Sequence, residues 1–311
     1  LVLGYTVEGF KEKDNGVEVL LKDNPSLQAD MVVLAIGVTP DTVLAKKAGL
    51  ELGIKESIVV NDRMETSVPD IYAAGDAVQV KHYVTGNDAL ISLAGPANKQ
   101  GRIIADNICG GDSHYLGSQG SSVIKVFDMT AATTGINETN AKKSGLEVDT
   151  VILSPMSHAG YYPGGKVMTM KVIFEKESYR LLGAQIIGYE GVDKRIDVLA
   201  TAIHAGLKAT QLKDLDLAYA PPYSSAKDPV NMAGFMIDNI AKGTLKQWHL
   251  EDMDKISKDK NAVLLDVRTI GEFSRGHING FKNIPVDELR ERINEVEKGK
   301  PVYLICQSGL R

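Results

Sequence analysis

The sequence predicts an α/β fold built from several domains, and three observations support this prediction. The chain has 311 residues, a length that corresponds to roughly two domains. A continuous apolar run at 29–36 is typical of a strand buried on both faces of a parallel sheet. Strand patterns from residue 116 onwards precede helical patterns, which is the α+β arrangement.

The composition narrows the class of protein. Hydrophobic residues make up 43% of the chain and charged residues 24%, as in ordinary globular proteins. The formal charge of −5 argues against a nucleic-acid partner, and no apolar run approaches the roughly 18 residues that span a bilayer. The two cysteines, Cys109 and Cys306, exclude a disulfide framework and favour a reducing, cytoplasmic compartment. No metal site is predicted.

Both ends of the sequence suggest that it is an internal fragment of a longer protein. It opens inside a strand pattern without a Met, and it stops at Arg311 within a loop. The first 41 residues contain an alternating strand pattern at 16–22 and the apolar run at 29–36, which Pro40 ends. Gly37 would let a ligand approach the backbone, although a plain exit from strand to loop explains these residues equally well.

The segment 66–77 (Thr-Ser-Val-Pro-Asp-Ile-Tyr-Ala-Ala-Gly-Asp-Ala) is the most informative stretch. A short strand over 71–74, made of small and apolar residues, leads into Gly75 and Asp76. The Asp76 carboxylate would lie at the carboxyl end of a strand, where α/β folds bind ligands, and would accept a hydrogen bond from a sugar or ribityl hydroxyl. The alternative is that Asp76 caps the next turn.

Helical spacing predicts a short helix over 42–48 and a longer one over 94–108. The amino end of the longer helix carries free N–H groups and a positive dipole. Its apolar residues include Ile103, Ile104 and Ile108, and Cys109 at its end is expected to be a buried structural cysteine.

The middle of the chain combines predicted strands and helices with two tyrosine-bearing loops. Strands are expected at 121–129, 166–175 and 180–188, and helices at 192–206 and 230–240. The loops at 158–165 and 218–231 are rich in Gly and Pro, so they can hold side chains rigidly toward a site. Asp228 and Pro229 are typical of the N-cap and first position of the last helix.

The final part predicts a small α/β unit that ends in a cysteine loop. Helices are expected at 250–258, 269–274 and 286–297, and strands at 261–268 and 302–305. Successive backbone N–H groups of the loop from Cys306 to Arg311 can form an anion nest that stabilises a thiolate or persulfide, and Arg311 adds a positive charge. Asp266, Arg268 and His277 are expected to hold the unit together.

The segment 66–77, the Ala-Ile-Gly-x-x-Pro run ending at Pro40 and the helix at 94–108 resemble FAD-dependent pyridine nucleotide–disulfide oxidoreductases. The resemblance implies FAD and NAD(P)H as cofactors. Asp76 with Gly75 would hold the ribityl chain, Ala94 and Gly95 would face the flavin pyrimidine, and Ile36–Gly37 would lie near the nicotinamide. The G-x-G-x-x-G fingerprint is not in this chain, so NADH and NADPH cannot be distinguished.

The loop at 218–231 resembles the C-terminal segment of CoA-disulfide reductases and of related CoA persulfide and polysulfide reductases. In that group two tyrosines reach across a homodimer to the partner's flavin and active-site sulfur. Tyr161 and Tyr219 match them best, and Tyr162 and Tyr223 are the alternatives. A phenol there can donate a proton to a departing thiolate.

The resemblance also implies coenzyme A as substrate or bound thiol. Lys227 matches a residue that meets the CoA phosphate, where a lysine acts as a point charge. Asn98 is a further candidate on the CoA side.

The final unit resembles a rhodanese domain, of which only the first part is expected to be present. The six residues from Cys306 to Arg311 fit sulfur-transferring members better than related phosphatases, which use one more residue in this loop. The implied organisation is the end of a Rossmann-like NAD(P)H-binding domain, the C-terminal part of an FAD-binding domain, a dimerisation domain, a linker and a truncated rhodanese domain, with boundaries at 1–41, 42–115, 116–242, 243–250 and 251–311.

The implied activity is NAD(P)H-dependent reduction of CoA disulfide, CoA persulfide or polysulfide. Hydride from the nicotinamide and electrons from FAD would reach a flavin-proximal cysteine outside this chain, and Cys306 would relay sulfane sulfur as a persulfide. Two alternatives remain open. One is an NADH oxidase or peroxidase fused to rhodanese, and the other is a redox-sensing sulfur carrier.

Overall fold

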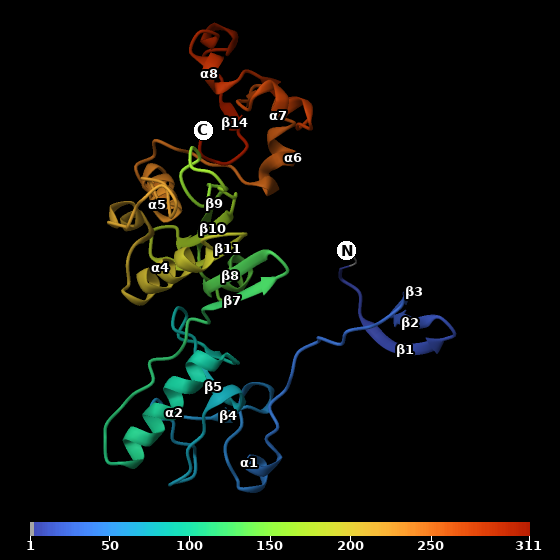
Figure 1. The fold of residues 1–311 in the computed structure, drawn as a ribbon, viewed down its shortest axis with the longest axis vertical. Helices are drawn as coiled ribbons and strands as arrows, with labels where there is room; N and C mark the ends of the chain where they lie inside the picture. Colours follow the sequence, from blue (N-terminus) through green and yellow to red (C-terminus); the bar gives the residue numbers. More distant parts are fainter. Residues whose placement is uncertain (1–2) are drawn as a thin grey trace. The chain divides into compact units, whose positions relative to one another are not determined.

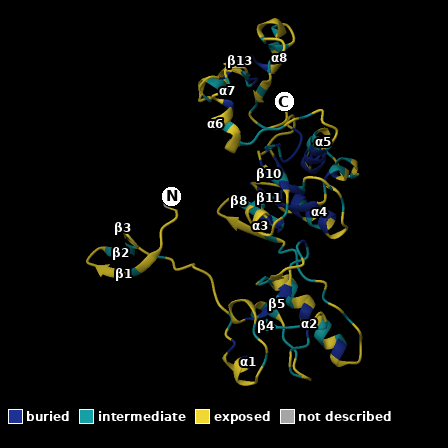
Figure 2. Cartoon of the chain, turned by 180° about the vertical axis from the view of Figure 1, so that it is seen from behind, coloured by how far each residue is buried: buried dark blue, intermediate teal, exposed yellow. Residues whose placement is uncertain are grey.

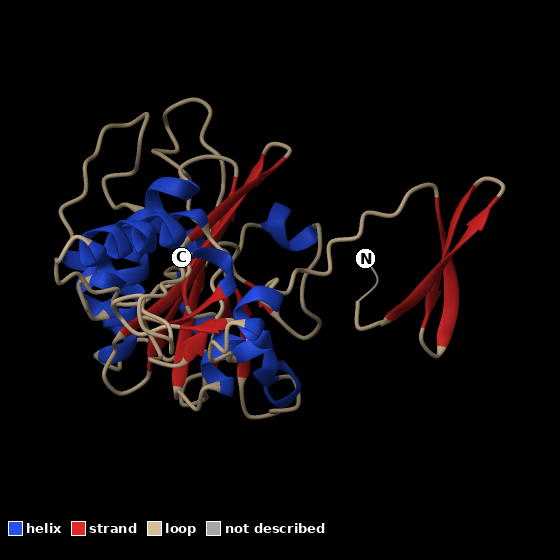
Figure 3. Cartoon of the chain, turned by 90° about the horizontal axis from the view of Figure 1, so that it is seen from below, coloured by secondary structure: helices blue, strands red, loops and turns tan. Residues whose placement is uncertain are grey.

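The computed structural model describes residues 3–311, which fall into two compact units with the boundary after Asp41. The described part of the first unit contains a three-stranded antiparallel sheet (Figure 3). Its middle strand confirms the strand predicted at 16–22. Its strands are β1 (Val7–Lys13), β2 (Gly16–Leu21) and β3 (Asn24–Ala29).

The predicted buried strand at 29–36 is wrong. β3 ends at Ala29, and the residues from 31 to 40 have no regular structure. Their apolar side chains are mostly exposed, with Ile36 at 86%. A strand needs a neighbouring backbone to receive its hydrogen bonds, and no described strand pairs with this segment.

The segment after Asp41 builds a small three-stranded sheet beside one long helix. The sheet has the order β4 (Ile58–Val59), β5 (Val78–Lys81) and β6 (Asp88–Ala89). Both predicted helices are confirmed, as α1 (Val43–Lys47) and α2 (Ala94–Ile108). Met64, Val78 and Val80 form the buried core, against which Ile103 and Ile104 of α2 pack.

Two expectations in this segment fail. The predicted strand at 71–74 is only a single bridge between Glu65 and Tyr72, followed by the 3-10 turn η2 (Gly75–Ala77). Cys109 is exposed rather than buried, and Ile108 is 64% exposed. The end of α2 buries Asn107 instead, because its amide donates to the carbonyls of Arg63 and Ser113, so the next residues face solvent.

The largest core belongs to a five-stranded antiparallel sheet with the order β7-β8-β11-β10-β9 (Figure 1). Helices α4 and α5 pack on it, and burial is concentrated in these helices and in β10 and β11 (Figure 2). The strands are β7 (Ser122–Val126), β8 (Met129–Gly135), β9 (Val148–Leu153), β10 (Thr169–Glu175) and β11 (Leu181–Gly188), and the helices are α3 (Glu138–Lys143), α4 (Val192–His204) and α5 (Pro229–Ala241).

The predicted strands and helices of this region are confirmed, while β8, β9 and α3 were not predicted. Asp228 caps α5 as expected, because its side chain accepts a hydrogen bond from the Val230 N–H and Pro229 holds the first position. No helix among residues 3–311 is both long and apolar enough to cross a membrane.

The last part contains a parallel sheet with the order β13-β12-β14. The predicted helix at 286–297 is wrong beyond its first turn, because the chain forms α8 and then a separate 3-10 turn, which bring Leu289 and Val296 onto the core of this part. Ile293 between them is 51% exposed, so a continuous helix would gain little burial there. The elements are η4 (Leu250–Asp252), α6 (Met253–Ile256), β12 (Val263–Asp266), α7 (Ile270–Ser274), β13 (Lys282–Asn283), α8 (Val286–Leu289), η5 (Ile293–Glu295) and β14 (Val302–Ile305).

Candidate functional sites

The structure brings the two predicted tyrosines into direct contact. The hydroxyls of Tyr161 and Tyr219 lie 2.7 Å apart, although the residues are 58 positions apart in the sequence. The loops that carry them are also joined at their bases, where the Ala159 N–H donates to the Ser224 carbonyl at 3.0 Å. Two loops with different origins therefore present one pair of phenols.

The phenol pair faces solvent, and the pKa of Tyr219 is raised. Tyr161 is 76% exposed and Tyr219 is 44% exposed, so a ligand can reach both hydroxyls. The hydrogen bond with Tyr161 raises the pKa of Tyr219, because a bond in which the Tyr219 hydroxyl donates has to be given up when that phenol ionises. Tyr219 therefore remains protonated over the neutral range and can donate a proton.

The neighbouring tyrosines are placed differently. The ring of Tyr162 meets the buried His158 ring edge-on, with the centroids 5.6 Å apart. Tyr223 is exposed, and in the described chain its hydroxyl has no hydrogen-bond partner. Only Tyr161 and Tyr219 thus form a shared phenol pair among these four residues.

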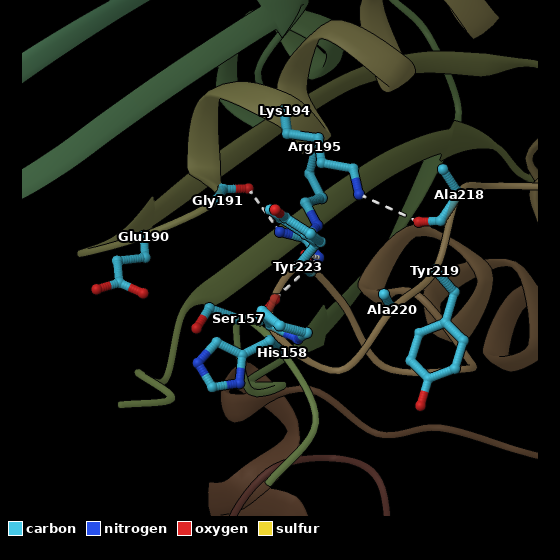
Figure 4. Close-up of a pocket in the computed structure, with 11 residues that line it drawn as sticks. Ser157, His158, Glu190, Gly191, Lys194, Arg195, Ala218, Tyr219, Ala220 and Tyr223 are labelled. Carbon is cyan, nitrogen blue, oxygen red and sulfur yellow. Dashed lines mark hydrogen bonds between the residues drawn. The ribbon is translucent and has the colours of Figure 1, made fainter. Parts of the chain in front are cut away.

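A cavity of about 450 Å³ opens beside Tyr219, between the start of α4 and the loop at 218–223 (Figure 4). Its lining combines the acidic Glu190, the basic Lys194 and the buried His158 with Tyr223. The Lys194 ammonium lies 3.5 Å from the Ala218 carbonyl. The cavity can therefore offer charges of both signs to a polar group close to the phenol pair.

A buried ion pair adjoins this cavity, and its Arg195 forms part of the lining. Arg195 and Asp228 are 1% and 3% exposed, and an Arg195 terminal nitrogen lies 2.9 Å from the Asp228 carboxylate. Sequence reasoning missed Arg195. The available signal was its position within the apolar stripe of α4, between Val192 and Leu199, where a charge must be buried with a partner.

The residues expected to bind FAD lie together at the start of α2. Gly75 has a φ of +84°, and its N–H donates to the buried Gln100 side chain of α2 at 2.7 Å. The Asp76 carboxylate is exposed and accepts no hydrogen bond from a described residue. Ala94 and Gly95 are exposed at a helix end that has no side-chain cap. A carboxylate acceptor and uncapped N–H donors fit the hydroxyl-rich chain and the polar ring edge of a flavin.

The other expected ligand-binding residues are more scattered. Ile36 and Gly37 lie in the first unit, in its exposed irregular segment. Lys227 is exposed, with its ammonium 5.7 Å from the centre of the Phe235 ring. Asn98 is exposed on α2 without a described side-chain partner. No described contact joins Lys227 to Asn98.

The cysteine loop places one backbone donor on the Cys306 sulfur among the described contacts, where a nest of several was expected. The Cys306 sulfur accepts a hydrogen bond from the Gly309 N–H at 3.1 Å. A cavity of about 270 Å³ adjoins this sulfur and is lined by Arg268, His277 and Gln307 among others. The site can therefore hold a sulfur anion next to a small open space.

The charged residues around this loop hold one another in place. Arg311 donates two hydrogen bonds to Glu272, at 2.5 and 2.8 Å, and this pairing lowers the pKa of Glu272 to about 2. Arg268 makes a similar fork with the fully buried Asp266. His277 stacks on Phe273 with the ring centres 3.8 Å apart. These contacts agree with the structural role expected for Asp266, Arg268 and His277.

Comparison with protein families accounts for nearly the whole chain. The model described as pyridine nucleotide-disulphide oxidoreductase matches residues 1–101, and the model of the dimerisation domain of the same family matches residues 121–229. The chain belongs to the pyridine nucleotide-disulphide oxidoreductases. A rhodanese-like domain model matches residues 249–311. The mixed α/β fold with a dimerisation domain and a rhodanese-like domain is thereby confirmed.

Individual relatives agree with this assignment. Reduced CoADR-RHD of Bacillus anthracis is 48% identical with a TM-score of 0.91, over 97% of this chain and 54% of that one. An NAD-dependent persulfide reductase of A. fulgidus is 40% identical with a TM-score of 0.88, over 97% and 55%. The NAD(P)H sulfur oxidoreductase (CoA-dependent) of Pyrococcus abyssi is 37% identical over 70% of this chain and 49% of its own. The chain thus spans about half the length of these relatives.

Proposed function

We propose that this protein is an FAD-dependent NAD(P)H oxidoreductase that reduces CoA disulfide, CoA persulfide or polysulfide, with a rhodanese module that relays sulfane sulfur. The observation that carries the proposal is the 2.7 Å hydrogen bond between Tyr161 and Tyr219. The names of relatives support the same substrate class. One is called an NAD-dependent persulfide reductase, another an NAD(P)H sulfur oxidoreductase (CoA-dependent), and a third CoADR-RHD.

The phenol pair acts as the proton donor to departing sulfur. Reduction of a disulfide or persulfide releases a thiolate, which is a better leaving group when a hydrogen bond or proton meets it. Tyr161 and Tyr219 are both accessible, and the raised pKa of Tyr219 keeps it protonated until it donates. In the homodimer that the dimerisation domain suggests, this pair would serve the partner subunit's flavin site.

The remaining residues bind and orient the cofactors and the substrate. Asp76, Gly75 and the amino end of α2 at Ala94 and Gly95 would hold FAD, which supplies electrons for sulfur reduction when bound. Ile36–Gly37 would contact the nicotinamide of NAD(P)H. Lys227 provides an exposed positive charge for a CoA phosphate, with Asn98 as a second polar contact on α2.

Cys306 performs the sulfur relay. Its thiolate attacks the outer sulfur of a persulfide R–S–SH, so that a Cys306–S–SH forms and the R–S⁻ thiolate leaves with the electron pair of the broken S–S bond. The Gly309 N–H, 3.1 Å from the sulfur, stabilises negative charge before and after transfer. Arg311, oriented by Glu272, adds positive charge to the loop.

The same proposal includes a cytoplasmic location. It also includes domain boundaries after residues 41, 115, 242 and 250. The match of successive family models supports the order of domains. Two cysteines without a disulfide favour a reducing compartment.

NADH oxidation by the full-length protein tests the proposal, with CoA disulfide or CoA persulfide supplied under anaerobic conditions and oxygen supplied in a separate assay. We expect turnover with a CoA sulfur substrate, and a fall of about 100-fold in kcat in Tyr161→Phe with Tyr219→Phe, because proton donation typically contributes 10²–10⁴-fold. Tyr162→Phe is the matched control. Turnover with oxygen alone, unchanged in the double variant, would instead identify an NADH oxidase, and absence of steady NADH consumption would identify a sulfur carrier.

A further inference from the structure

We propose that Arg195 is the positioning residue that sets the geometry of the Tyr161–Tyr219 pair. This inference rests on the proposed function of that pair as proton donor. Arg195 does not touch either phenol. It acts on the two loops that carry them, from the side opposite to solvent.

One guanidinium joins both tyrosine loops. A terminal nitrogen of Arg195 donates to the Ser157 carbonyl at 2.9 Å, at the start of the loop that carries Tyr161. The same nitrogen lies 3.4 Å from the Tyr223 carbonyl, in the loop that carries Tyr219 (Figure 4). It also lies 3.1 Å from the Ser224 hydroxyl of that loop. The two loops are therefore held to a single rigid fork on α4.

The Arg195 guanidinium is itself held in place, and its positive charge is balanced by the Asp228 carboxylate. The Asp228 carboxylate receives Arg195 at 2.9 and 3.1 Å and the Ser224 hydroxyl at 2.7 Å. Its other oxygen accepts the Val230 N–H at the start of α5. Another Arg195 nitrogen donates to the Gly191 carbonyl at 3.2 Å. With its charge paired and its donors occupied, Arg195 serves as an internal anchor rather than as a binding site for a substrate anion.

Short stretches of chain connect this anchor to the phenols. Tyr161 follows Ser157 by four residues, and the intervening Ala159 donates to the Ser224 carbonyl. The Tyr223 and Ser224 N–H groups both donate to the Ala220 carbonyl, next to Tyr219. If the Arg195 contacts are lost, the two loops can move, and the 2.7 Å contact between the Tyr161 and Tyr219 hydroxyls changes. A displacement of about 1 Å caused far from the chemistry can lower the rate about 10²-fold.

The test compares Arg195→Lys with the paired variant Arg195→Gln plus Asp228→Asn. A lysine keeps the charge but cannot form the fork, and the paired variant removes both charges, so that no buried charge is left alone. Lys213→Gln is the control, because it breaks the Lys213–Asp238 ion pair, which shares no described hydrogen-bond or ion-pair partner with Arg195. The full-length flavoprotein is labelled with 3-fluorotyrosine, and the ¹⁹F signals of Tyr161 and Tyr219 are assigned by their Phe variants.

We expect the titration midpoint of Tyr219 to fall in both Arg195 variants and to stay unchanged in Lys213→Gln. We also expect kcat with CoA disulfide to fall about tenfold or more, with KM for NADH unchanged. Unchanged ¹⁹F midpoints in the paired variant would overturn the inference, even where Arg195→Lys fails to fold. If the wild-type protein reduces no CoA sulfur substrate but the midpoint still falls, the proposed function fails and the positioning role stands.

Discussion

At the scale of single residues, the phenol pair has a property that a lone tyrosine lacks. Each hydroxyl can donate to the other, so one proton can be released while the remaining hydrogen bond reorganises around it. The raised pKa of Tyr219 depends first on Tyr161. The pair therefore makes a specific prediction about pH.

Activity that needs neutral Tyr219 should be lost as the pH rises through the pKa of this residue. In Tyr161→Phe the hydrogen bond that raises this pKa is gone, so the alkaline loss of activity should move to lower pH. The measurement is the pH dependence of kcat for CoA disulfide reduction. Tyr162→Phe should keep the wild-type profile, because Tyr162 packs against His158 and not against the pair. An identical alkaline limb in Tyr161→Phe would contradict the prediction.

Residue-scale prediction from sequence succeeded where the signal was local. Gly and Pro content marked the two loops as rigid, while the family resemblance selected Tyr161 and Tyr219 within them, and the structure joins their hydroxyls. Arg195 escaped notice because its partners Ser157 and Asp228 are 38 and 33 positions away, and no local pattern records such a pairing. The burial of Cys109 was misjudged because a helix end has no periodic signal to say which face it turns inward.

At the scale of elements, α3 shows how one carboxylate fixes a short helix. Glu138 lies in its first turn, pairs with Lys142 in the same helix at 2.5 Å and also pairs with Lys171 of β10. These contacts, led by that with Lys142, lower the pKa of Glu138 to about 2. A six-residue helix is too short to be stable alone, so this cross-link holds it on the sheet.

Glu138→Gln should therefore lower the free energy of unfolding by about 1 kcal/mol at neutral pH, a value reduced for the partial exposure of the ion pairs. Because the folded pKa lies below the ordinary 4.5, the stabilisation is present above pH 4.5 and is lost as the pH falls through about 2. Urea unfolding of both proteins across this range is the measurement. Glu147→Gln, whose side chain forms no described ion pair, is the control. A difference that persists undiminished at pH 2 would refute the electrostatic explanation.

Element prediction was reliable where a segment carries its own packing surface. The apolar stripe of α4 and the alternation in β10 each find their core in this chain. The segments 29–36 and 286–297 carry strong patterns too, but residues 31–36 pair with no described strand, and 286–297 reaches its core through two short turns instead of one helix. The periodicity of apolar residues predicts which face of a segment should be buried. Whether that face is buried depends on a neighbouring element that packs against it.

At the scale of the whole molecule, the rhodanese-like domain is attached to the dimerisation domain through edge strand β9. The Asp149 carboxylate lies 2.9 Å from the His249 ring, and the Thr150 carbonyl accepts from Gln247 at 3.0 Å. Beyond the end of the strand, the Ser154 N–H donates to the Ser308 carbonyl of the cysteine loop at 2.9 Å. An edge strand has unpaired backbone groups, and here they receive the linker and the sulfur-carrying loop. Domain contacts of this kind have no sequence pattern and could not be predicted.

Gly309 is the residue on which this attachment depends most closely. Its φ is +74°, a conformation that favours glycine, and a Cβ there would lie 2.9 Å from the Ile152 carbonyl oxygen of β9. Its N–H is also the donor to Cys306. Gly309→Ala should therefore lose loop docking and sulfur stabilisation together.

The left-handed conformation alone costs an alanine about 1 kcal/mol, or about fivefold in the population of the correct loop, and the clash adds to this. We expect sulfur transfer from Cys306 to fall at least fivefold in Gly309→Ala. Trp248, the single tryptophan, donates to the Leu304 carbonyl of β14, so its fluorescence should report undocking as increased quenching by acrylamide. Gly271→Ala, where a Cβ meets no atom within 4 Å, should change neither property. Loss of transfer without a change in Trp248 quenching would mean that the loop's own geometry, and not its docking on β9, controls the sulfur relay.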